Sequence, residues 1–238
     1  MQHTADIRNR LLAALPPDRL AWLRPKLEPV ELPYGQSLYL PERPITAVHF
    51  VETGVVSTLA SFKDGALVEV GVIGREGLVG LPLILGADAA PIEARVQMAG
   101  TALRLDAEAF REELGRSPAW GALLFRYALA YHAQVAQGAG CNARHSLEQR
   151  LARWLLQAHD RAEGNEFPMT HEFLALMLGV RRAGVTGAAG ALQEAGFIRY
   201  ERGCIEVIDR SGLEAAACEC HSIVRREFER LLGPAAGA

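Results

Sequence analysis

The sequence predicts an α+β fold in which an N-terminal antiparallel β-roll is joined by a long helix to a C-terminal winged helix-turn-helix. Three observations lead to this prediction. Short β-like runs separated by turn residues occupy residues 30–105, as in an antiparallel barrel, roll or sandwich. Ser117 and Pro118 then open a long apolar segment of helical spacing, as an N-cap and a first helical residue do. Finally, residues 170–208 show the order helix, turn, helix and β-hairpin, which is that of a winged helix.

The N-terminal region is predicted to begin with helical turns and to continue as strands. Residues 6–29 carry apolar side chains at helical spacing, and Pro16-Pro17 breaks them. Asp64-Gly65 is a strong hairpin signal within the region that follows. A short helix capped by its first residue is predicted over 106–114. The predicted strands are 47–51, 55–61, 67–73, 93–98 and 102–105, and turns at Thr53-Gly54 and Ala99-Gly100 are expected between the first two and the last two of them.

The long helix is predicted to run from Pro118 to about Arg144 with an apolar stripe along it. On a helix that joins two domains, such a stripe typically packs against a second copy of itself. The alternative is packing on the β-roll alone. We favour a homodimer, because the helix is too long to be covered by a small roll. The predicted dimer interface consists of Trp120, Leu124, Tyr127, Tyr131 and Gln134.

The C-terminal region is predicted to start at a capping box formed by Ser146 and Gln149. A polar loop over 160–165 precedes the helix-turn-helix, and residues 211–232 are predicted as one amphipathic helix followed by a frayed tail, 233–238. A chain of 238 residues can hold one large domain or two ordinary ones. The predicted domains are 1–116, 117–145 and 146–238.

The helix-turn-helix is predicted from cap and turn residues. Thr170 is suited to cap the first helix, and Gly179 supplies a tight turn. A second helix over 181–195 ends at Gly196. In DNA-binding proteins the first helix of such a pair crosses the phosphates and the second enters the major groove. The alternative is an ordinary αα-hairpin in a globular core.

Two short strands within 197–208 favour DNA binding over that alternative. They hinge near Arg202-Gly203 and would form a wing, which places Arg199 and Arg202 where a wing touches phosphates. The two helices and this wing together predict a partner, double-stranded DNA. The predicted DNA-binding residues are Thr170, Arg181, Arg182, Thr186, Arg199 and Arg202.

Charge supports DNA binding only locally. The net charge is −3, from 25 basic and 28 acidic residues, which argues against a protein coated in nucleic acid. Residues 181–202 instead carry four arginines against two glutamates, a local charge of +2. A compact basic face that is doubled in a dimer is sufficient for DNA.

Composition also bounds where the protein works. Half of the residues are apolar, which is enough for hydrophobic cores. No apolar run approaches the roughly 20 residues needed to cross a bilayer, and the first residues lack the basic and apolar regions of a signal peptide. We therefore expect a soluble, cytoplasmic protein with no membrane partner.

The four cysteines, Cys141, Cys204, Cys218 and Cys220, are too few and too scattered for a disulfide framework. Cys218 and Cys220 with His221 suggest a metal site. However, two residues of a Cys-x-Cys pair on one helix point their thiols apart. We therefore expect structural thiols and no metal.

The order of parts and four stretches resemble the Crp/Fnr family of bacterial transcription regulators. The stretches are 72–80, 148–156, 169–198 and 203–214, and the resemblance covers nearly the whole chain. It implies a cyclic-nucleotide-binding-like roll, a dimerisation helix and a DNA-binding winged helix that acts on a pseudo-palindromic site. It also implies an effector that repositions the reading helices, and RNA polymerase as a further partner.

One departure from the family concerns the effector. Cyclic-nucleotide-binding members use an Arg-Ser or Arg-Thr pair for the cyclic phosphate, and Ile92 and Glu93 stand at those positions here. A carboxylate repels a phosphate that a guanidinium would bind. We therefore expect no cyclic AMP and no cofactor, and either an unidentified small molecule or no ligand. The effector pocket is assigned to Gly77, Gly80, Glu93, Arg95, Tyr127 and Tyr131.

Other sensors of the family lack their ligands in this chain. An iron–sulfur sensor needs clustered cysteines near the N-terminus, and no cysteine precedes Cys141. His49 in the roll leaves haem ligation open, but it is equally suited to be a surface or core histidine.

The second departure lies in the reading helix. Many relatives carry Arg-Glu-x-x-x-Arg, whereas this chain has Arg182, Ala183 and Gly187. Arg182 can pair bidentately with guanine, Arg181 is suited to a phosphate, and Thr186 to a base or a thymine methyl. Glycines weaken this helix by about 1 kcal/mol each relative to alanine. They permit close approach either to DNA or to a packing neighbour; they are Gly184, Gly187 and Gly190.

Two other functions compete with this assignment. An enzyme with a cupin-like metal pocket would need converging histidines and carboxylates, and residues 30–105 contain only His49 as a histidine. A sensor or scaffold whose winged helix has lost DNA is the other alternative. The four arginines of residues 181–202 favour DNA, so we expect a regulator and not an enzyme.

Overall fold

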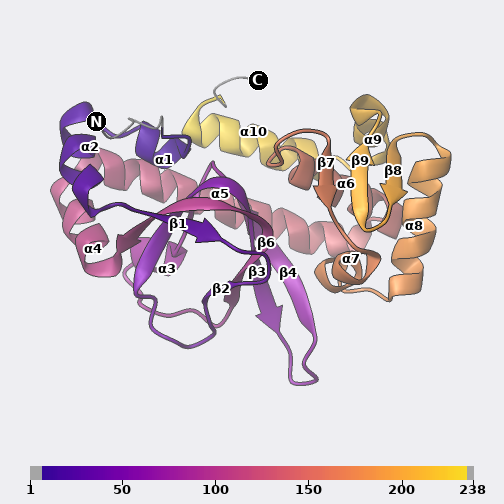
Figure 1. Ribbon diagram of the computed structural model, residues 1–238, viewed down its shortest axis with the longest axis horizontal. Coiled ribbons are helices and arrows are strands. Elements are labelled where there is room, and N and C mark those ends of the chain that lie inside the picture. The colour runs from indigo at the N-terminus through magenta and orange to yellow at the C-terminus, as the bar shows by residue number, and fades with distance from the viewer. Residues whose placement is uncertain (1–6, 235–238) are drawn as a thin grey trace. The chain divides into compact units, whose positions relative to one another are not determined.

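The structure, a computed structural model, describes residues 7–234 and contains the predicted succession of roll, long helix and winged helix (Figure 1). The helices are α1 (Arg10–Ala13), α2 (Pro17–Leu23), the 3-10 helix η1 (Arg24–Lys26), α3 (Leu81–Ile84), α4 (Ala107–Arg116), α5 (Pro118–Arg144), α6 (Leu147–His159), α7 (His171–Leu178), α8 (Arg182–Glu194), α9 (Arg210–Ala216) and α10 (Cys220–Leu232). The strands are β1 (Glu28–Leu32), β2 (Ser37–Tyr39), β3 (Ala47–Ser61), β4 (Leu67–Ile73), β5 (Leu78–Val79), β6 (Glu93–Asp106), β7 (Glu166–Pro168), β8 (Ile198–Glu201) and β9 (Cys204–Val207). The predicted helix start at residue 6 and most of the predicted tail lie outside the described residues.

The chain divides into two compact units. One contains the residues up to Val56 together with Ile73–Ala128, and the other contains Ser57–Val72 and Leu129 onward. These units differ from the predicted domains 1–116, 117–145 and 146–238. The hairpin of β3 and β4 groups with the second half of α5, because Val72 N–H donates to Gln134 Oε1 at 2.8 Å and Gln134 Nε2 donates back to Val72 O at 3.2 Å.

The large sheet has the order β1-β6-β3-β4, with β2 also on β6 and β5 on β3. Four of the predicted strands merge into two, β3 and β6, because the glycines expected at turns instead face one another across the sheet. A Cβ on Gly100 would lie 2.1 Å from Thr53 O, and one on Gly54, at φ +80°, would lie 2.5 Å from Met98 O. Glycine is therefore needed here for close backbone approach rather than for a turn.

Aromatic rings form the centre of the first unit. Phe50, Phe110 and Trp120 pack with ring centroids 5.7–6.5 Å apart, and Trp120 Nε1 donates to Leu11 O at 3.0 Å. The predicted cap of the short helix is confirmed, because Asp106 accepts from Glu108 N at 2.8 Å. These contacts fix the start of α5 onto its own chain.

The second unit contains a three-stranded sheet of order β7-β9-β8 beside α6 to α10. The predicted capping box is confirmed at the start of α6, where Ser146 Oγ accepts from Gln149 N and Ser146 N donates to Gln149 Oε1. Strand β7 was not predicted. The single helix predicted over 211–232 is wrong: the chain is extended at Ala217, with ψ 162°, and this separates α9 from α10.

Candidate nucleic-acid interface

The two helices of the predicted helix-turn-helix are confirmed as α7 and α8. Thr170 caps α7 by accepting from Phe173 N at 3.2 Å. Gly179 ends the same helix in the left-handed region, at φ +63°, where its N–H donates to Leu176 O. A residue without Cβ adopts this conformation at no steric cost. The chain can therefore turn within three residues and start α8 at Arg182.

The N-terminus of α8 is exposed and carries positive charge. Arg181 occupies the N-cap position with φ −74° and ψ 143°, and no side chain caps the helix. The Arg182 side chain is 70% exposed and lies 3.9 Å from Glu172 Oε2. Free backbone N–H groups and the helix dipole favour an anion at such an end. Both predicted arginines thus lie where a phosphate and a base edge can be reached from one helix end.

The three glycines of α8 have two different environments. A Cβ on Gly184 would lie 3.0 Å from Cδ2 of Leu147, so the Leu147 side chain of α6 would have to shift slightly to admit a methyl group there. A Cβ on Gly187 or Gly190 would meet nothing within 4 Å. The packing explanation therefore applies to Gly184 only. At Gly187 and Gly190 the helix backbone is not covered by any side chain of the described residues.

A polar cluster that the sequence did not reveal connects α7, α8 and the wing. The His171 ring stacks on Tyr200 with centroids 4.1 Å apart, and its Nδ1 lies 3.1 Å from Thr186 Oγ1. Thr186 Oγ1 also donates to Arg182 O at 3.1 Å. Burial, and then the charge of Arg182, lower the pKa of His171. The Thr186 hydroxyl, which was predicted to contact a base, is thus hydrogen-bonded to its own helix and to His171. This arrangement depends on tertiary structure, so the sequence alone does not indicate it.

The wing is present as β8 and β9, and its arginines are paired within the chain. Arg199 Nη1 lies 2.6 Å from Glu206 Oε2, and Arg202 Nε lies 3.7 Å from Glu201 Oε1. Arg202 stands at the hairpin turn with φ +51°, and its side chain is 91% exposed. Exposed ion pairs of this kind contribute at most about 1 kcal/mol. Each arginine can therefore exchange its carboxylate for a phosphate at small cost.

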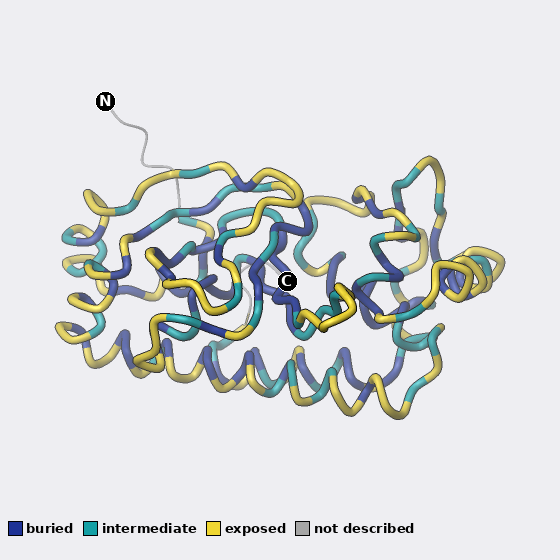
Figure 2. The backbone as a smooth tube through the Cα atoms, turned by 90° about the horizontal axis from the view of Figure 1, so that it is seen from below, coloured by how far each residue is buried: buried dark blue, intermediate teal, exposed yellow. Residues whose placement is uncertain are grey.

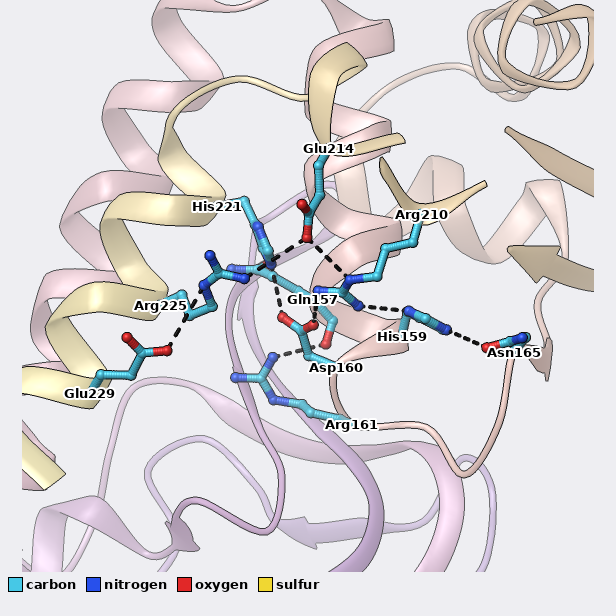
Figure 3. A network of polar contacts seen from close by, with 10 residues as sticks. All are labelled: Gln157, His159, Asp160, Arg161, Asn165, Arg210, Glu214, His221, Arg225 and Glu229. Atoms are coloured by element: carbon cyan, nitrogen blue, oxygen red, sulfur yellow. Dashed lines mark hydrogen bonds and ion pairs between the residues drawn. The ribbon is translucent and has the colours of Figure 1, made fainter. Parts of the chain in front are cut away.

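A charged network connects helices of the second unit (Figure 3). Asp160 accepts from His221 Nε2 at 2.8 Å and from Arg210 Nη2 at 2.5 Å. Arg210 also lies 2.7 Å from His159 Nδ1, which extends the network toward the loop before β7. Burial alone would raise the pKa of Asp160, but its hydrogen bonds and the charges of His221 and Arg210 hold it below its usual range. The network joins the end of α6 to α9 and α10.

The residues assigned to an effector pocket are filled or paired within their own units. Tyr127 Oη donates to Leu78 O at 3.1 Å, and its ring covers Gly77, where a Cβ would lie 2.4 Å from that oxygen. Glu93 binds Arg95 through two hydrogen bonds, at 2.7 and 2.9 Å. The Arg95 guanidinium, which lies closest in sequence to the position of the phosphate-binding pair of relatives, is therefore already paired with a carboxylate.

The other two effector assignments are also in close contact with their own chain. Gly80 lies in the left-handed region at φ +116°, and a Cβ there would lie 2.9 Å from Val48 Cγ1. In the second unit the Tyr131 hydroxyl bonds Thr58 Oγ1, and its ring covers Gly71.

A cavity elsewhere in the second unit has polar walls. It has a volume of about 150 Å³ and is lined by parts of β4, α5 and α6, including Glu69 and Gln134. Arg153 Nε and Gln157 Nε2, on two buried lining residues, have no hydrogen-bond partner. Buried donors of this kind are normally satisfied by ordered water or by a ligand. The cavity can therefore hold a small molecule that carries hydrogen-bond acceptors.

The predicted dimer stripe occupies the buried side of α5, so the prediction chose the wrong face. All five of its side chains are buried within one chain: Trp120, Leu124, Tyr127, Tyr131 and Gln134. The alternative, packing on the roll side of the same chain, accounts for them. Phe125 and Leu129 lie on another face and are 54% and 50% exposed. Figure 2 shows exposed stretches recurring along this long helix.

The fold and this interface define a winged-helix protein with a β-roll of the cyclic-nucleotide-binding type. Residues 29–117 match the cyclic nucleotide-binding domain, and residues 149–216 match the Crp-like helix-turn-helix domain. The chain belongs to the Crp/Fnr family of transcriptional regulators.

Solved structures share the fold at low sequence identity. FixK2 from Bradyrhizobium japonicum aligns with a TM-score of 0.70 and 16% identity over 81% of this chain and 98% of its own. A putative regulator of the Crp/Fnr family from Eubacterium rectale gives 0.67 and 20% over 87% and 96%, respectively. A CRP family regulator from Thermus thermophilus gives 0.66 and 19% over 79% and 96%. No curated protein matches the chain. Within residues 7–234, no helix is both long and apolar enough to cross a membrane.

Proposed function

We propose that the protein is a homodimeric transcription regulator that binds a pseudo-palindromic DNA site and reads it with α8. The observation that carries this proposal is the exposed, uncapped start of α8 with Arg181 and Arg182. Arg182 pairs with a guanine edge, and Arg181 and the helix N-terminus bind phosphate. The wing arginines, Arg199 and Arg202, bind the flanking backbone.

The two open glycines of α8 support DNA as the ligand. Each glycine weakens the helix by about 1 kcal/mol relative to alanine, and neither Gly187 nor Gly190 has a neighbour in the chain that needs the space. Close approach of a partner surface gives them a role. In the competing scaffold function, a protein partner would occupy this surface, but exposed arginines at a helix start fit a polyanion better.

We propose that a second copy of the chain packs on the exposed face of α5. Phe125 and Leu129 are four residues apart and large, apolar and half exposed, and residues at this spacing share one helix face. A symmetric contact between two such helices covers both residues in each chain. Two reading helices then bind the two halves of one site.

We propose that cyclic AMP does not bind the roll in the way that phosphate-cassette members bind it. Glu93 is buried and holds Arg95 in two hydrogen bonds, so a phosphate would have to displace a carboxylate from its own ion pair. Calorimetric titration with cyclic AMP should give no saturable heat. Saturation at one ligand per chain would contradict this proposal.

A catalytic role has little support in the roll. Burial, followed by the charge of Arg104, lowers the pKa of His49 to about 4. This histidine is the only one among residues 30–105, and a cupin-like metal pocket needs several ligands that converge. We therefore propose a binding protein without enzymatic activity.

The test is in vitro selection of DNA from a random pool with the purified chain and no added ligand. We expect enrichment of a two-fold symmetric site with a guanine at one fixed position in each half. Enrichment that appears only with an added metabolite would retain the DNA function and identify an effector. The absence of enrichment with and without cyclic nucleotides and metabolites would contradict DNA binding.

A further inference from the structure

Four potential metal ligands converge between the end of α5 and the start of α10. They are the thiols of Cys141, Cys218 and Cys220 and the imidazole of His145. Their ligand atoms all lie within 4.8 Å of one another, and the three cysteines are buried. The structure thus contradicts the expectation that the Cys-x-Cys pair points its thiols apart. Cys218 lies in the loop between α9 and α10 and Cys220 begins α10, so the pair does not share one helix.

The other two ligands, Cys141 and His145, were not predicted, although they are four residues apart in the sequence. Cys141 is in the last turn of α5, and His145 N–H donates to Cys141 O at 3.0 Å. Residues four apart on a helix lie on one face, so these two side chains point the same way. The histidine next to Cys220, His221, is held by Asp160 at 2.8 Å and belongs to the network of Figure 3 instead.

The distances fit a single tetrahedral ion. Zn–S bonds of about 2.3 Å and Zn–N bonds of about 2.0–2.1 Å imply ligand separations of about 3.8 Å between sulfurs and about 3.5 Å between sulfur and nitrogen. The Sγ atoms of Cys141 and Cys218 are 3.5 Å apart, and Cys220 Sγ lies 3.6 Å from His145 Nδ1. Small side-chain rotations suffice to place all four atoms around one ion.

Neighbouring polar groups support the same arrangement. Glu219 Oε2 lies 3.3 Å from His145 Nε2, which leaves Nδ1 as the nitrogen that faces the thiols. A carboxylate on the far nitrogen is the usual partner of a metal-binding histidine. Gln137 Nε2 donates to Cys220 Sγ at 3.1 Å, and Cys220 is the first residue of a helix, where the dipole stabilises a thiolate.

We propose that Cys141, His145, Cys218 and Cys220 bind one zinc ion in a closed Cys₃His site. Soft thiolates with one imidazole in a tetrahedral set select zinc among the common divalent ions. A disulfide between Cys141 and Cys218 would use two of these groups and leave Cys220 and His145 without a role. The bound ion ties the end of α5 to the loop between α9 and α10, all within one compact unit. This inference does not depend on DNA binding.

The test uses the full chain, reduced, freed of metal with a chelator and titrated with Co²⁺. Tetrahedral cobalt with thiolate ligands gives intense visible d–d bands and a thiolate-to-metal charge-transfer band in the near ultraviolet. We expect these bands to saturate at one ion per chain. Zinc should then displace cobalt and raise the Tm of the metal-free protein, because an ion that binds only the folded state stabilises it.

Three variants and one control decide whether these residues are the ligands. Cys218→Ser and His145→Gln should abolish saturation at one ion per chain, and the histidine variant replaces a side chain at the edge of the cluster. Glu219→Gln keeps all four ligands and should weaken zinc binding by about 10–100-fold. Cys204→Ser changes the fourth cysteine, in β9, and should bind cobalt as the wild type does.

Three results would overturn the proposal. The reduced wild-type chain could show no cobalt bands, or Cys204→Ser could lose them as Cys218→Ser does. In the third result, mass spectrometry finds a disulfide between Cys141 and Cys218 and the reduced chain takes up no metal, which would make this pair a redox pair.

Discussion

Arg182 combines two properties that a base-reading residue needs, since it is exposed and it is anchored at the start of α8. Arg182→Ala should cost about 1–3 kcal/mol of affinity for the selected site and relax specificity at one base pair of each half. Fluorescence anisotropy on the selected site and on single-base variants of it measures both effects.

Arg199→Ala is the matched comparison from the wing. Loss of the Arg199 side chain should weaken binding to all DNA sequences about equally. It should also lower the slope of log affinity against log salt concentration by about 1. Equal effects of the two variants on specificity would show that α8 does not read bases.

The glycines of α8 give a second prediction at the residue scale. Gly187→Ala should stabilise the fold by up to about 1 kcal/mol, because alanine is the better helix former and the site is open. The same change should weaken DNA binding if the added methyl group stands between helix and groove. Urea unfolding and anisotropy separate the two effects.

Gly184→Ala serves as the control for this prediction. Its Cβ would lie 3.0 Å from Leu147, so steric contact offsets the gain in helix propensity. A variant Gly187→Ala that gains stability and keeps full DNA affinity would remove the close-approach role of this glycine.

At the scale of the elements, periodicity and caps predicted most of the helices, because both are local. The capping box at Ser146, the cap at Thr170 and the turn at Gly179 are each contained within four residues, and all three are confirmed. The predictions were wrong where the structure of a segment depends on another segment that is distant in sequence. Gly54 and Gly100 resemble turn residues in the sequence, and only the pairing of β3 with β6 shows that each lies against the backbone of the other strand.

The same limit explains the two misassigned sites. The stripe from Trp120 to Gln134 is apolar at helical spacing, but periodicity shows only that this helix face is buried. It does not show whether the same chain or a second copy buries it. The cysteine cluster was missed because Cys141 and Cys218 are far apart in sequence and the break between α9 and α10 was not predicted.

The contact between β4 and α6 gives a prediction on pH. Glu69 is half-buried, and its carboxylate accepts from Ser57 Oγ at 2.7 Å and from Trp154 Nε1 at 2.8 Å. Burial raises its pKa from 4.5 to about 7. The folded chain therefore keeps this proton where the unfolded chain has lost it. This group lowers stability progressively as the pH rises from about 4.5 to about 7, by about 3 kcal/mol in total.

Glu69→Gln removes the titration while keeping an acceptor for Trp154. The variant should match the wild type at pH 4.5 and exceed its stability above pH 7. Urea unfolding across this range measures the difference. Glu148→Gln, on an exposed residue of α6, is the control and should keep the wild-type profile. If the difference in free energy of unfolding between the wild type and Glu69→Gln were the same at all these pH values, the carboxyl group would not be desolvated in the folded chain.

At the scale of the whole molecule, the proposed function requires two chains, because one winged helix reads only one half of a symmetric site. The proposed contact uses the face of α5 on which Phe125 and Leu129 are exposed. Charges at both positions in each chain would meet like charges across a symmetric interface. The double variant Phe125→Glu with Leu129→Glu should therefore be monomeric while its fold is kept, since neither side chain is buried in the chain.

Loss of the dimer should be visible in DNA binding as well as in mass. Binding of the second half-site becomes intramolecular once the first is bound, which contributes roughly 10²–10⁴ in affinity. The double variant should lose that factor on the full site and keep wild-type affinity for an isolated half-site. Sedimentation equilibrium and anisotropy on both DNAs measure the two effects.

Leu85→Glu is the control: it changes a side chain that is 63% exposed outside α5, and this variant should remain dimeric. A double variant that stays dimeric would move the interface away from this face of α5, whereas a monomeric variant with unchanged affinity for the full site would separate dimerisation from DNA reading.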